Sequence, residues 1–262
     1  MEKWLVNNGL PLSEDLFLGG KVRLLQPVDG YRAATDPVLL AASIPARAGQ
    51  CILDVGCGVG AASFCLAARV AGVHLCGIDI QDTLVDIAQK NRVLNDMEDR
   101  ARFVCADLLS RPMDPVPNSF DHVMANPPFY EAGSGHRPPN EIKARAHMEV
   151  AEGASLQNWV DYMLRMTKPK GTVTFINRVE RLEETLAAFK GRLGELILFP
   201  IWSMSPTGTQ ARGAKRFILQ GRKGIKTQLT FANGLVVHED DGSYSKKAKA
   251  ILQEGDGLVL KP

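Results

Sequence analysis

Short apolar runs alternate with longer segments of helical period along the chain, and this alternation constrains the fold more than any other feature. Runs with the length of buried strands occupy residues 51–55, 73–79, 102–105, 120–125 and 171–176. The segments 61–71, 82–95 and 155–164 repeat apolar residues every three and four positions, as helix faces do, and Ser155 is the expected N-cap of the last helix. Parallel neighbouring strands require crossover connections, which helices supply. We therefore predict an α/β fold with helices on both faces of a parallel sheet.

The later part of the chain departs from this alternation. Residues 195–202 and 214–220 resemble strands, but the segment between them is too short for a crossover helix, so we expect them to pair antiparallel at one edge. The predicted sheet is then seven-stranded and mixed. Asp36 and Pro37 predict a helix with Asp36 as its N-cap. The dipeptide at 233–234 is Asn-Gly and predicts a hairpin turn, and residues 246–253 predict a short terminal helix.

These patterns divide the chain into three parts. We expect residues 1–44 to form an N-terminal extension, a hairpin and a helix, that packs on the core. Residues 45–226 should form the main domain, in which ligands bind at the carboxyl ends of the strands. Residues 227–262 should form a C-terminal extension that packs on the sheet edge.

Composition and charge exclude several classes of protein. The net charge is only +2, so any nucleic acid must bind a local basic patch. No segment has the apolar length of a membrane span or the pattern of a signal peptide, and we expect a cytoplasmic protein without membrane contact. No metal-ligand spacing occurs, and nothing specifies an oligomeric state. The five cysteines lie in apolar runs and are expected to be reduced core residues: Cys51, Cys57, Cys65, Cys76 and Cys105.

A glycine-rich loop with the sequence DVGCGVG follows the first of these strands, at residues 54–60. Glycines let the backbone turn sharply and approach a ligand closely. Asp54 would repel a pyrophosphate but suits the ammonium group of an amino acid. Asp79, at the tip of the next strand, can accept hydrogen bonds from ribose hydroxyls, and Asp107, just past the third strand, from an adenine amine. Helix caps and a simple turn explain each acid singly, but the ordered set favours an S-adenosylmethionine site.

The segment MANPPFY, residues 124–130, follows the fourth strand. The side-chain carbonyl of Asn126 and the backbone carbonyl of Pro127 can accept both N–H groups of an aryl or amide amine, which makes its nitrogen a better nucleophile. The rigid prolines hold this path. Phe129, with Tyr130, offers a face on which a planar group can stack. The simpler alternative is a strand-terminating Asn-Pro turn with two core aromatics.

Together LDVGCGVG, GIDI, CADL and ANPPFY resemble the class I methyltransferases of the small-domain group, whose Rossmann-like sheet also ends in an antiparallel pair. The blocks LLQPVDGYRAATDPVLLAAS, NEIKARAHMEV and FINRVERLEETL are similar to the branch of tRNA1(Val) adenine-37 N6-methyltransferases, over about residues 15–225. The resemblance implies catalytic roles for Asn126, Pro127, Pro128 and Phe129. It implies that S-adenosylmethionine is held by Thr35, Asp36, Asp54, Gly56, Gly58, Gly60, Asp79, Ile80, Asp107 and Leu108.

A basic stretch provides a second indication of the substrate. Residues 201–226 contain six Lys and Arg side chains and no acid, which is suited to phosphate contacts. A solvated basic face is the alternative. The expected substrate-binding residues are Tyr130, Arg145, Arg212, Lys215 and Arg216. We therefore predict methylation of adenine N6 in tRNA; the alternatives are a glutamine amide in protein, guanine N2 in rRNA, or RNA binding by a cofactor-binding module without catalysis.

Overall fold

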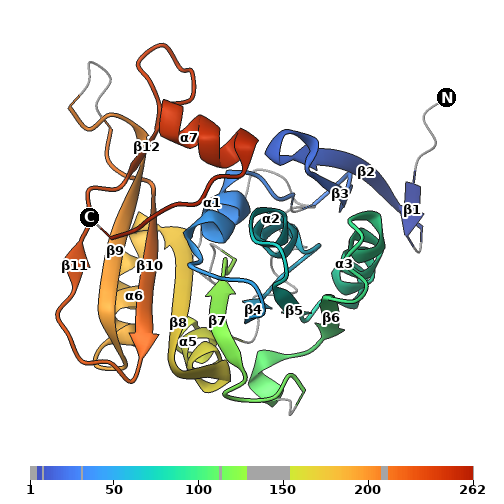
Figure 1. The fold of residues 1–262 in the computed structure, drawn as a ribbon, viewed down its shortest axis with the longest axis horizontal. Helices are drawn as coiled ribbons and strands as arrows, with labels where there is room; N and C mark the ends of the chain where they lie inside the picture. The colour runs from blue at the N-terminus through green and yellow to red at the C-terminus, as the bar shows by residue number, and fades with distance from the viewer. Residues whose placement is uncertain are drawn as a thin grey trace.

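A computed structural model describes residues 5–7, 9–30, 32–111, 114–128, 154–207 and 212–261. The strands of its main sheet are β4 (Cys51–Val55), β5 (His74–Asp79), β6 (Ala101–Cys105), β7 (Phe120–Ala125), β8 (Thr167–Arg178), β9 (Leu193–Met204), β10 (Arg216–Lys223), β11 (Thr230–Phe231) and β12 (Leu235–His238). Their order is β11-β9-β10-β8-β7-β4-β5-β6, and β12 also pairs with β9 (Figure 1). The seven predicted strands are all present, and β11 and β12 extend the sheet to nine.

The sheet is mixed in the predicted way. Strands β6, β5, β4, β7 and β8 run parallel. Strand β10 lies antiparallel between β8 and β9, which confirms the predicted antiparallel pair. The carboxyl ends of the parallel strands therefore meet at one edge of the sheet, where the loops after β4, β5, β6 and β7 lie side by side.

Helices cover both faces of the sheet. One face packs against α1 (Thr35–Ser43), α2 (Ala61–Arg69) and α3 (Asp82–Leu94), and the other against α5 (Leu156–Met166) and α6 (Leu182–Phe189) (Figure 1). Successive strand residues point to opposite faces. Ile52 therefore packs in the core on the α2 face and Leu53 in the core on the α5 face. In the described part of the chain, no helix is long and apolar enough to cross a membrane.

Two helix starts were predicted, and only one is correct. Ser155 caps α5. Its hydroxyl accepts from the backbone N–H of Asn158 at 3.3 Å, and the side-chain oxygen of Asn158 accepts from the backbone N–H of Ser155 at 2.9 Å. The expectation that Asp36 is an N-cap is wrong. Helix α1 begins at Thr35 with Ala34 as its N-cap, and Asp36 lies in the first turn, where its carboxylate pairs with Arg216.

The N-terminal residues form a separate antiparallel sheet of β1 (Leu5–Asn7), β2 (Leu10–Phe17) and β3 (Val22–Pro27), with the turn η1 (Leu18–Gly20) between the last two. A fully buried residue of α3, Asn91, joins this sheet to the glycine loop. Its amide oxygen accepts from the Leu25 N–H at 2.7 Å, and its amide nitrogen donates to the Leu25 and Val59 carbonyls, both at 3.0 Å. The glycine loop is thus supported from the N-terminal extension as well as from the main sheet.

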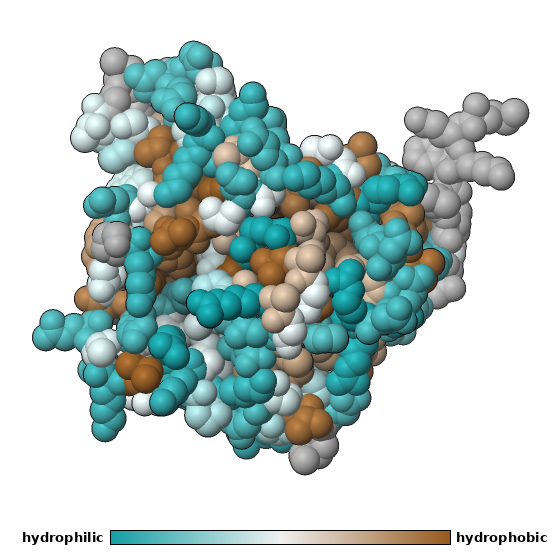
Figure 2. Space-filling view, viewed as in Figure 1, coloured by the Kyte–Doolittle hydropathy of each residue, from teal (hydrophilic) through white to brown (hydrophobic). Residues whose placement is uncertain are grey.

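The C-terminal residues differ from the predicted hairpin. Strands β11 and β12 do not pair with each other; both run parallel to β9, one after the other along its outer edge. Gly234 lies between them at φ 88°, where a Cβ would come within 2.3 Å of the Pro200 carbonyl oxygen. The predicted terminal helix is present as α7 (Lys246–Lys249) and its continuation η4 (Ala250–Glu254). Figure 2 shows hydrophilic residues over this helix at the top of the molecule.

All five cysteines are free thiols. Cys57, Cys65 and Cys76 are buried as predicted, and Cys51 is half-buried. The expectation of a core position is wrong for Cys105, which is exposed at the last position of β6, an edge strand. The expected division of the chain at residues 44/45 and 226/227 stays a prediction.

Candidate active site

The predicted site residues gather along one edge of the sheet. The glycine loop follows β4, Asp79 ends β5, Asp107 lies two residues past β6, and Asn126 directly follows β7. These strands are neighbours in the order β6-β5-β4-β7. At about 5 Å between adjacent strands, the four positions span about 15 Å. Asn126 lies one strand from the glycine loop, because Val55 of β4 pairs with Ala125 of β7.

The glycine loop is held from below and open on one side. The N–H groups of Gly56 and Cys57 donate to the Ile78 carbonyl at 2.8 and 2.9 Å. A Cβ on Gly56 would come within 2.5 Å of the Trp159 ring, and one on Gly60 within 2.5 Å of the Phe64 ring. A Cβ on Gly58 would meet no atom of the described part of the chain within 4 Å. The first and last glycines are therefore required for packing, whereas the middle glycine faces open space that a ligand can enter.

Asp79 supports the same loop. One of its carboxylate oxygens accepts from the Gly58 N–H at 2.8 Å and the other from the Gln81 N–H at 3.0 Å. Each oxygen has a second lone pair, so both can still accept from a ligand hydroxyl. Burial raises the pKa of Asp79. The next residue, Ile80, has a side chain that is 49% exposed at the rim of this region.

Asp54 lies deeper than predicted. It is only 3% exposed, and the Ser63 hydroxyl of α2 donates to its carboxylate at 2.8 Å. Burial raises the pKa of Asp54 to about 7; the Ser63 hydrogen bond opposes this shift, and the nearby Asp79 carboxylate adds to it. The carboxylate therefore lies beneath the glycine loop as a buried acid whose charge changes near neutral pH.

The third acid has a local structural partner. Asp107 caps the turn η2 (Leu108–Ser110), because its carboxylate accepts from the Leu109 N–H at 2.8 Å. Leu108 packs against the core on the α5 face. For Asp107, the simpler explanation as a helix cap therefore applies. A contact of Asp107 with the cofactor adenine stays a prediction.

Two predicted residues from different groups contact each other. Asp36, expected in the cofactor pocket beside Thr35, accepts from Arg216 Nε at 2.9 Å, and the two side chains are 17% and 25% exposed. This ion pair connects the first turn of α1 to the start of β10. Arg216 was predicted to contact RNA. It is partly buried and bound to Asp36, so it joins α1 to β10, and a contact with RNA stays a prediction.

The segment after β7 is described through Pro128. Asn126 and Pro128 are half-buried and Pro127 is buried. The predicted residues Phe129, Tyr130 and Arg145 lie outside the described residues.

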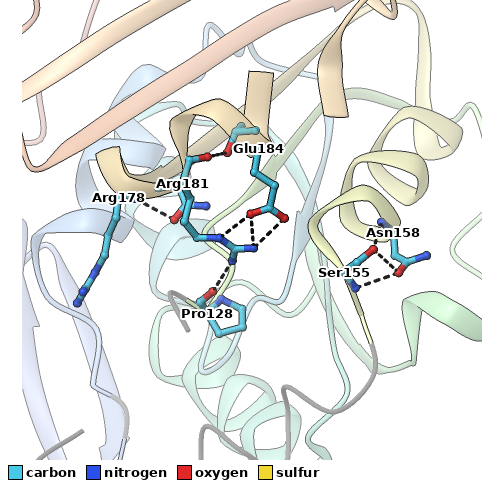
Figure 3. A network of polar contacts seen from close by, with 8 residues as sticks. Pro128, Ser155, Asn158, Arg178, Arg181 and Glu184 are labelled. Atoms are coloured by element: carbon cyan, nitrogen blue, oxygen red, sulfur yellow. Dashed lines mark hydrogen bonds and ion pairs between the residues drawn. The ribbon is translucent and has the colours of Figure 1, made fainter. Parts of the chain in front are cut away.

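An arginine that the sequence analysis did not select contacts this segment. Arg181 Nη1 donates to the Pro128 carbonyl oxygen at 3.4 Å, and Nε and Nη2 bind the Glu184 carboxylate (Figure 3). Both residues belong to the block FINRVERLEETL, which had contributed to the family resemblance without a role being assigned to any of its residues.

Comparison with known proteins identifies this arrangement. Residues 34–158 match the methyltransferase small domain family. A solved structure from Agrobacterium tumefaciens, described as a predicted O-methyltransferase, has a TM-score of 0.69 at 21% identity and covers 86% of this chain and 98% of its own. An S-adenosylmethionine-dependent O-methyltransferase from Thermotoga maritima has a TM-score of 0.53 at 14% identity, over 76% of this chain and 69% of its own. Residues 34–158 thus carry a methyltransferase small domain, and the fold is that of the class I methyltransferases.

Relatives of this methyltransferase carry a more specific name. Proteins from Shewanella woodyi and Shewanella loihica, both named tRNA1(Val) (adenine(37)-N6)-methyltransferase, are 23% and 27% identical to it. The matches cover 88% and 86% of this chain and 93% and 91% of theirs. The cofactor of the methyltransferase is S-adenosylmethionine, and the open space at Gly58, above two buried acids, fits a ligand that carries an ammonium group and hydroxyls but no phosphate.

The raised pKa of Asp54 predicts how cofactor binding depends on pH. The folded-state pKa of about 7 exceeds the usual 3.8, so this group lowers the free energy of unfolding progressively as the pH rises from about 4 to about 7. If the carboxylate holds the cofactor ammonium, affinity requires its ionised form. We expect the Kd for S-adenosylmethionine to fall about tenfold between about pH 6 and about pH 7.5, measured by calorimetry.

The control for this experiment is Asp54→Asn, which should bind weakly without a step in its pH profile. A wild-type Kd that does not change with pH would limit Asp54 to supporting the glycine loop through Ser63.

The basic stretch at 201–226 does not form one surface. Arg216 pairs with Arg178 at the carboxyl end of β8, whereas Arg222 pairs with Thr172, which lies opposite His122 near the amino end of β7. From Arg216 to Lys223, β10 spans about 24 Å, so the two ends of the stretch lie at opposite edges of the sheet. Lys223 Nζ donates to Asn118 and to two backbone carbonyls at 2.6–2.8 Å. The bases of this stretch therefore do not form a single patch, and their contact with RNA stays a prediction.

Proposed function

We propose that this methyltransferase transfers a methyl group to N6 of an adenine in tRNA. The observation that carries the proposal is the adjacency of β7 and β4, which brings Asn126 within one strand of the glycine loop. The names of the relatives from Shewanella support adenine in tRNA as the acceptor. An adenine stacked inside a folded tRNA must be flipped out to reach such a strand-end site.

The residues of the chain would act mainly by positioning. S-adenosylmethionine supplies a methyl group on a positively charged sulfur. The Asn126 side-chain carbonyl and the Pro127 backbone carbonyl accept the two N–H groups of the adenine amine, which directs the nitrogen lone pair toward the methyl carbon. When bound, the cofactor would give up this methyl group with its sulfur as the leaving group, and the nitrogen that Asn126 and Pro127 hold would then release one proton to water. No strong base is needed, because the amine becomes acidic only as the new bond forms.

The cofactor would lie across the loops after β4, β5 and β6. We assign its amino acid end to Asp54 and the Gly56–Gly60 loop, its ribose to Asp79, and its adenine to the region of Ile80, Asp107 and Leu108. The free lone pairs of Asp79 and the open space at Gly58 support this assignment. Thr35 and Asp36, at the start of α1, would close the pocket beside it.

Two exposed bases near the carboxyl edge of the sheet are proposed to contact the tRNA backbone. Arg212 and Lys215 precede β10 and are exposed, unlike Arg216, and β10 begins at the same edge as Asn126. Replacing both by alanine should weaken tRNA binding. The plot of log association constant against log salt concentration should become shallower by about 2, because each phosphate contact contributes about 1 to its steepness. Filter binding at several salt concentrations measures both quantities.

A matched control removes two exposed lysines at the opposite edge, Lys190 and Lys226. This variant has the same change in net charge and should bind tRNA with the wild-type salt slope. Equal losses in the two variants would mean that binding follows net charge alone, and tRNA contact at Arg212 and Lys215 would be rejected.

The proposed substrate class is tested by tritium transfer from S-adenosylmethionine. Unmodified tRNA, ribosomal RNA and a glutamine-containing peptide should be compared at equal concentration. We expect incorporation into tRNA alone. Incorporation only into the peptide or only into ribosomal RNA would replace the proposed substrate by that acceptor.

A further inference from the structure

Arg181 joins the end of the turn η3 (Val179–Arg181) to the segment that carries Asn126. Its side chain is 14% exposed and bridges two groups. On one side, Nε and Nη2 bind the Glu184 carboxylate at 2.9–3.1 Å; on the other, Nη1 donates to the Pro128 carbonyl oxygen at 3.4 Å (Figure 3). The residue thus connects α6, which packs on one face of the sheet, with the proposed acceptor segment at the sheet edge.

The local structure holds the guanidinium in one orientation. Arg181 and Glu184 are three residues apart at the start of α6, so their side chains lie on the same helix face. The Thr185 hydroxyl donates to the Arg181 carbonyl at 2.7 Å and holds the backbone at that point. A guanidinium is planar and its donors have a fixed geometry. With the Glu184 carboxylate bound to Nε and Nη2, Nη1 points toward the Pro128 carbonyl.

The segment needs such a support because of its composition. Pro127 and Pro128 have no N–H, so the backbone at these two residues can be held by hydrogen bonds only through carbonyl oxygens. Their rings fix φ, and ψ of Pro128 is the torsion that decides where the next residue goes. A donor bound to the Pro128 carbonyl restricts that torsion and anchors the end of the short segment that also carries Asn126 and the Pro127 carbonyl.

We propose that Arg181, oriented by Glu184, is a positioning residue that holds the Asn126–Pro128 segment in the shape required for methyl transfer. The inference rests on the proposed function, because the segment is the proposed acceptor of the amine N–H groups. Arg181 touches neither substrate nor cofactor in this role. It acts through the Pro128 carbonyl.

The kinetic test compares Arg181→Ala, Arg181→Lys and Glu184→Gln. Loss of a charged hydrogen bond that orients the segment should lower kcat for tRNA methylation about 10- to 100-fold in Arg181→Ala. The Kd for S-adenosylmethionine should stay within about twofold, because the glycine loop lies on another strand. Arg181→Lys should recover part of kcat, and Glu184→Gln, which keeps an acceptor but loses the charge, should lose less than Arg181→Ala.

Arg192→Ala is the matched control. Arg192 pairs with Asp161 of α5 at 2.6 Å, and these side chains are 33% and 38% exposed; unlike Arg181, Arg192 donates to Asp161 and the Ala188 carbonyl and not to the described residues 126–128. This variant removes an ion pair beside α6 and should keep the wild-type kcat. A drop in kcat equal to that of Arg181→Ala would show a general loss of stability and overturn the proposal.

Hydrogen exchange tests the same idea without any substrate. In Arg181→Ala, peptides spanning residues 120–130 should exchange several-fold faster than in wild type or in Arg192→Ala, while peptides from β4 and β5 should not change. Faster exchange in an enzyme that methylates no tRNA would retain the positioning role and reject the proposed substrate. Wild-type exchange together with wild-type kcat in Arg181→Ala would reject the positioning role and leave the proposed function intact.

Discussion

Replacing Asn126 by alanine is expected to lower kcat for methyl transfer about 100- to 1,000-fold, the usual effect of removing one preorganised partner of a transition state. The adenine amine is a poor nucleophile, since its lone pair is delocalised into the ring. It loses one of its two N–H acceptors in the variant, whereas the Pro127 carbonyl remains. Cofactor affinity should be nearly unchanged, because Asn126 follows β7 and the glycine loop follows β4.

Single-turnover methylation of tRNA, together with calorimetric binding of S-adenosylmethionine, measures both effects. Asn233→Ala is the control; Asn233 is exposed, and its contact with Trp202 uses the backbone carbonyl, which alanine keeps. A variant Asn126→Ala with wild-type single-turnover rate would exclude the Asn126 side chain from the reaction. A loss of cofactor binding equal to the loss of rate would assign it to the cofactor pocket.

Replacing Gly58 by alanine should raise the Kd for S-adenosylmethionine at least about tenfold. The added Cβ meets no atom of the described residues, so it would enter the space assigned to the cofactor, and overpacking costs about 1–3 kcal/mol. Gly58 has φ 54°, so alanine there also carries the backbone cost of a left-handed residue, about 1 kcal/mol.

Gly224→Ala separates these two costs. Gly224 has φ 76° and also has nothing within 4 Å of an added Cβ, but it follows β10 at the opposite edge of the sheet. Both variants should lose similar thermal stability, and only Gly58→Ala should lose cofactor affinity. If the two variants bind S-adenosylmethionine equally well, the cofactor does not lie against Gly58, and the assignment of the glycine loop fails.

Local patterns predicted the strands and most helices, because short apolar runs and apolar residues repeated every three or four positions can be recognised from neighbouring residues alone. The pairing of β9 with β10 was also predictable, since their connection is too short for a crossover. The Asn233-Gly234 turn was not. A glycine with positive φ occurs both in a hairpin turn and at a break between two strands that follow one another, and only the distant edge of β9 decides between the two.

The site was predictable where it follows strand order and unpredictable where it depends on tertiary contacts. The alignment of Asp79, the glycine loop and Asn126 follows from the parallel sheet. The contacts of Asp36 with Arg216 and of Arg181 with Pro128 join residues 180 and 53 positions apart, and no spacing indicates them. The separation of the basic residues could have been anticipated, because a strand the length of β10 carries its two ends to opposite edges of the sheet.

The most direct test of the account is mass-spectrometric identification of the nucleoside formed when unmodified tRNA is incubated with S-adenosylmethionine and the purified protein. We predict N6-methyladenosine with the wild-type protein and none with Asn126→Ala. A methylated guanosine, no methylated nucleoside, or equal N6-methyladenosine from both proteins would contradict the proposal that Asn126 presents an adenine amine to the cofactor.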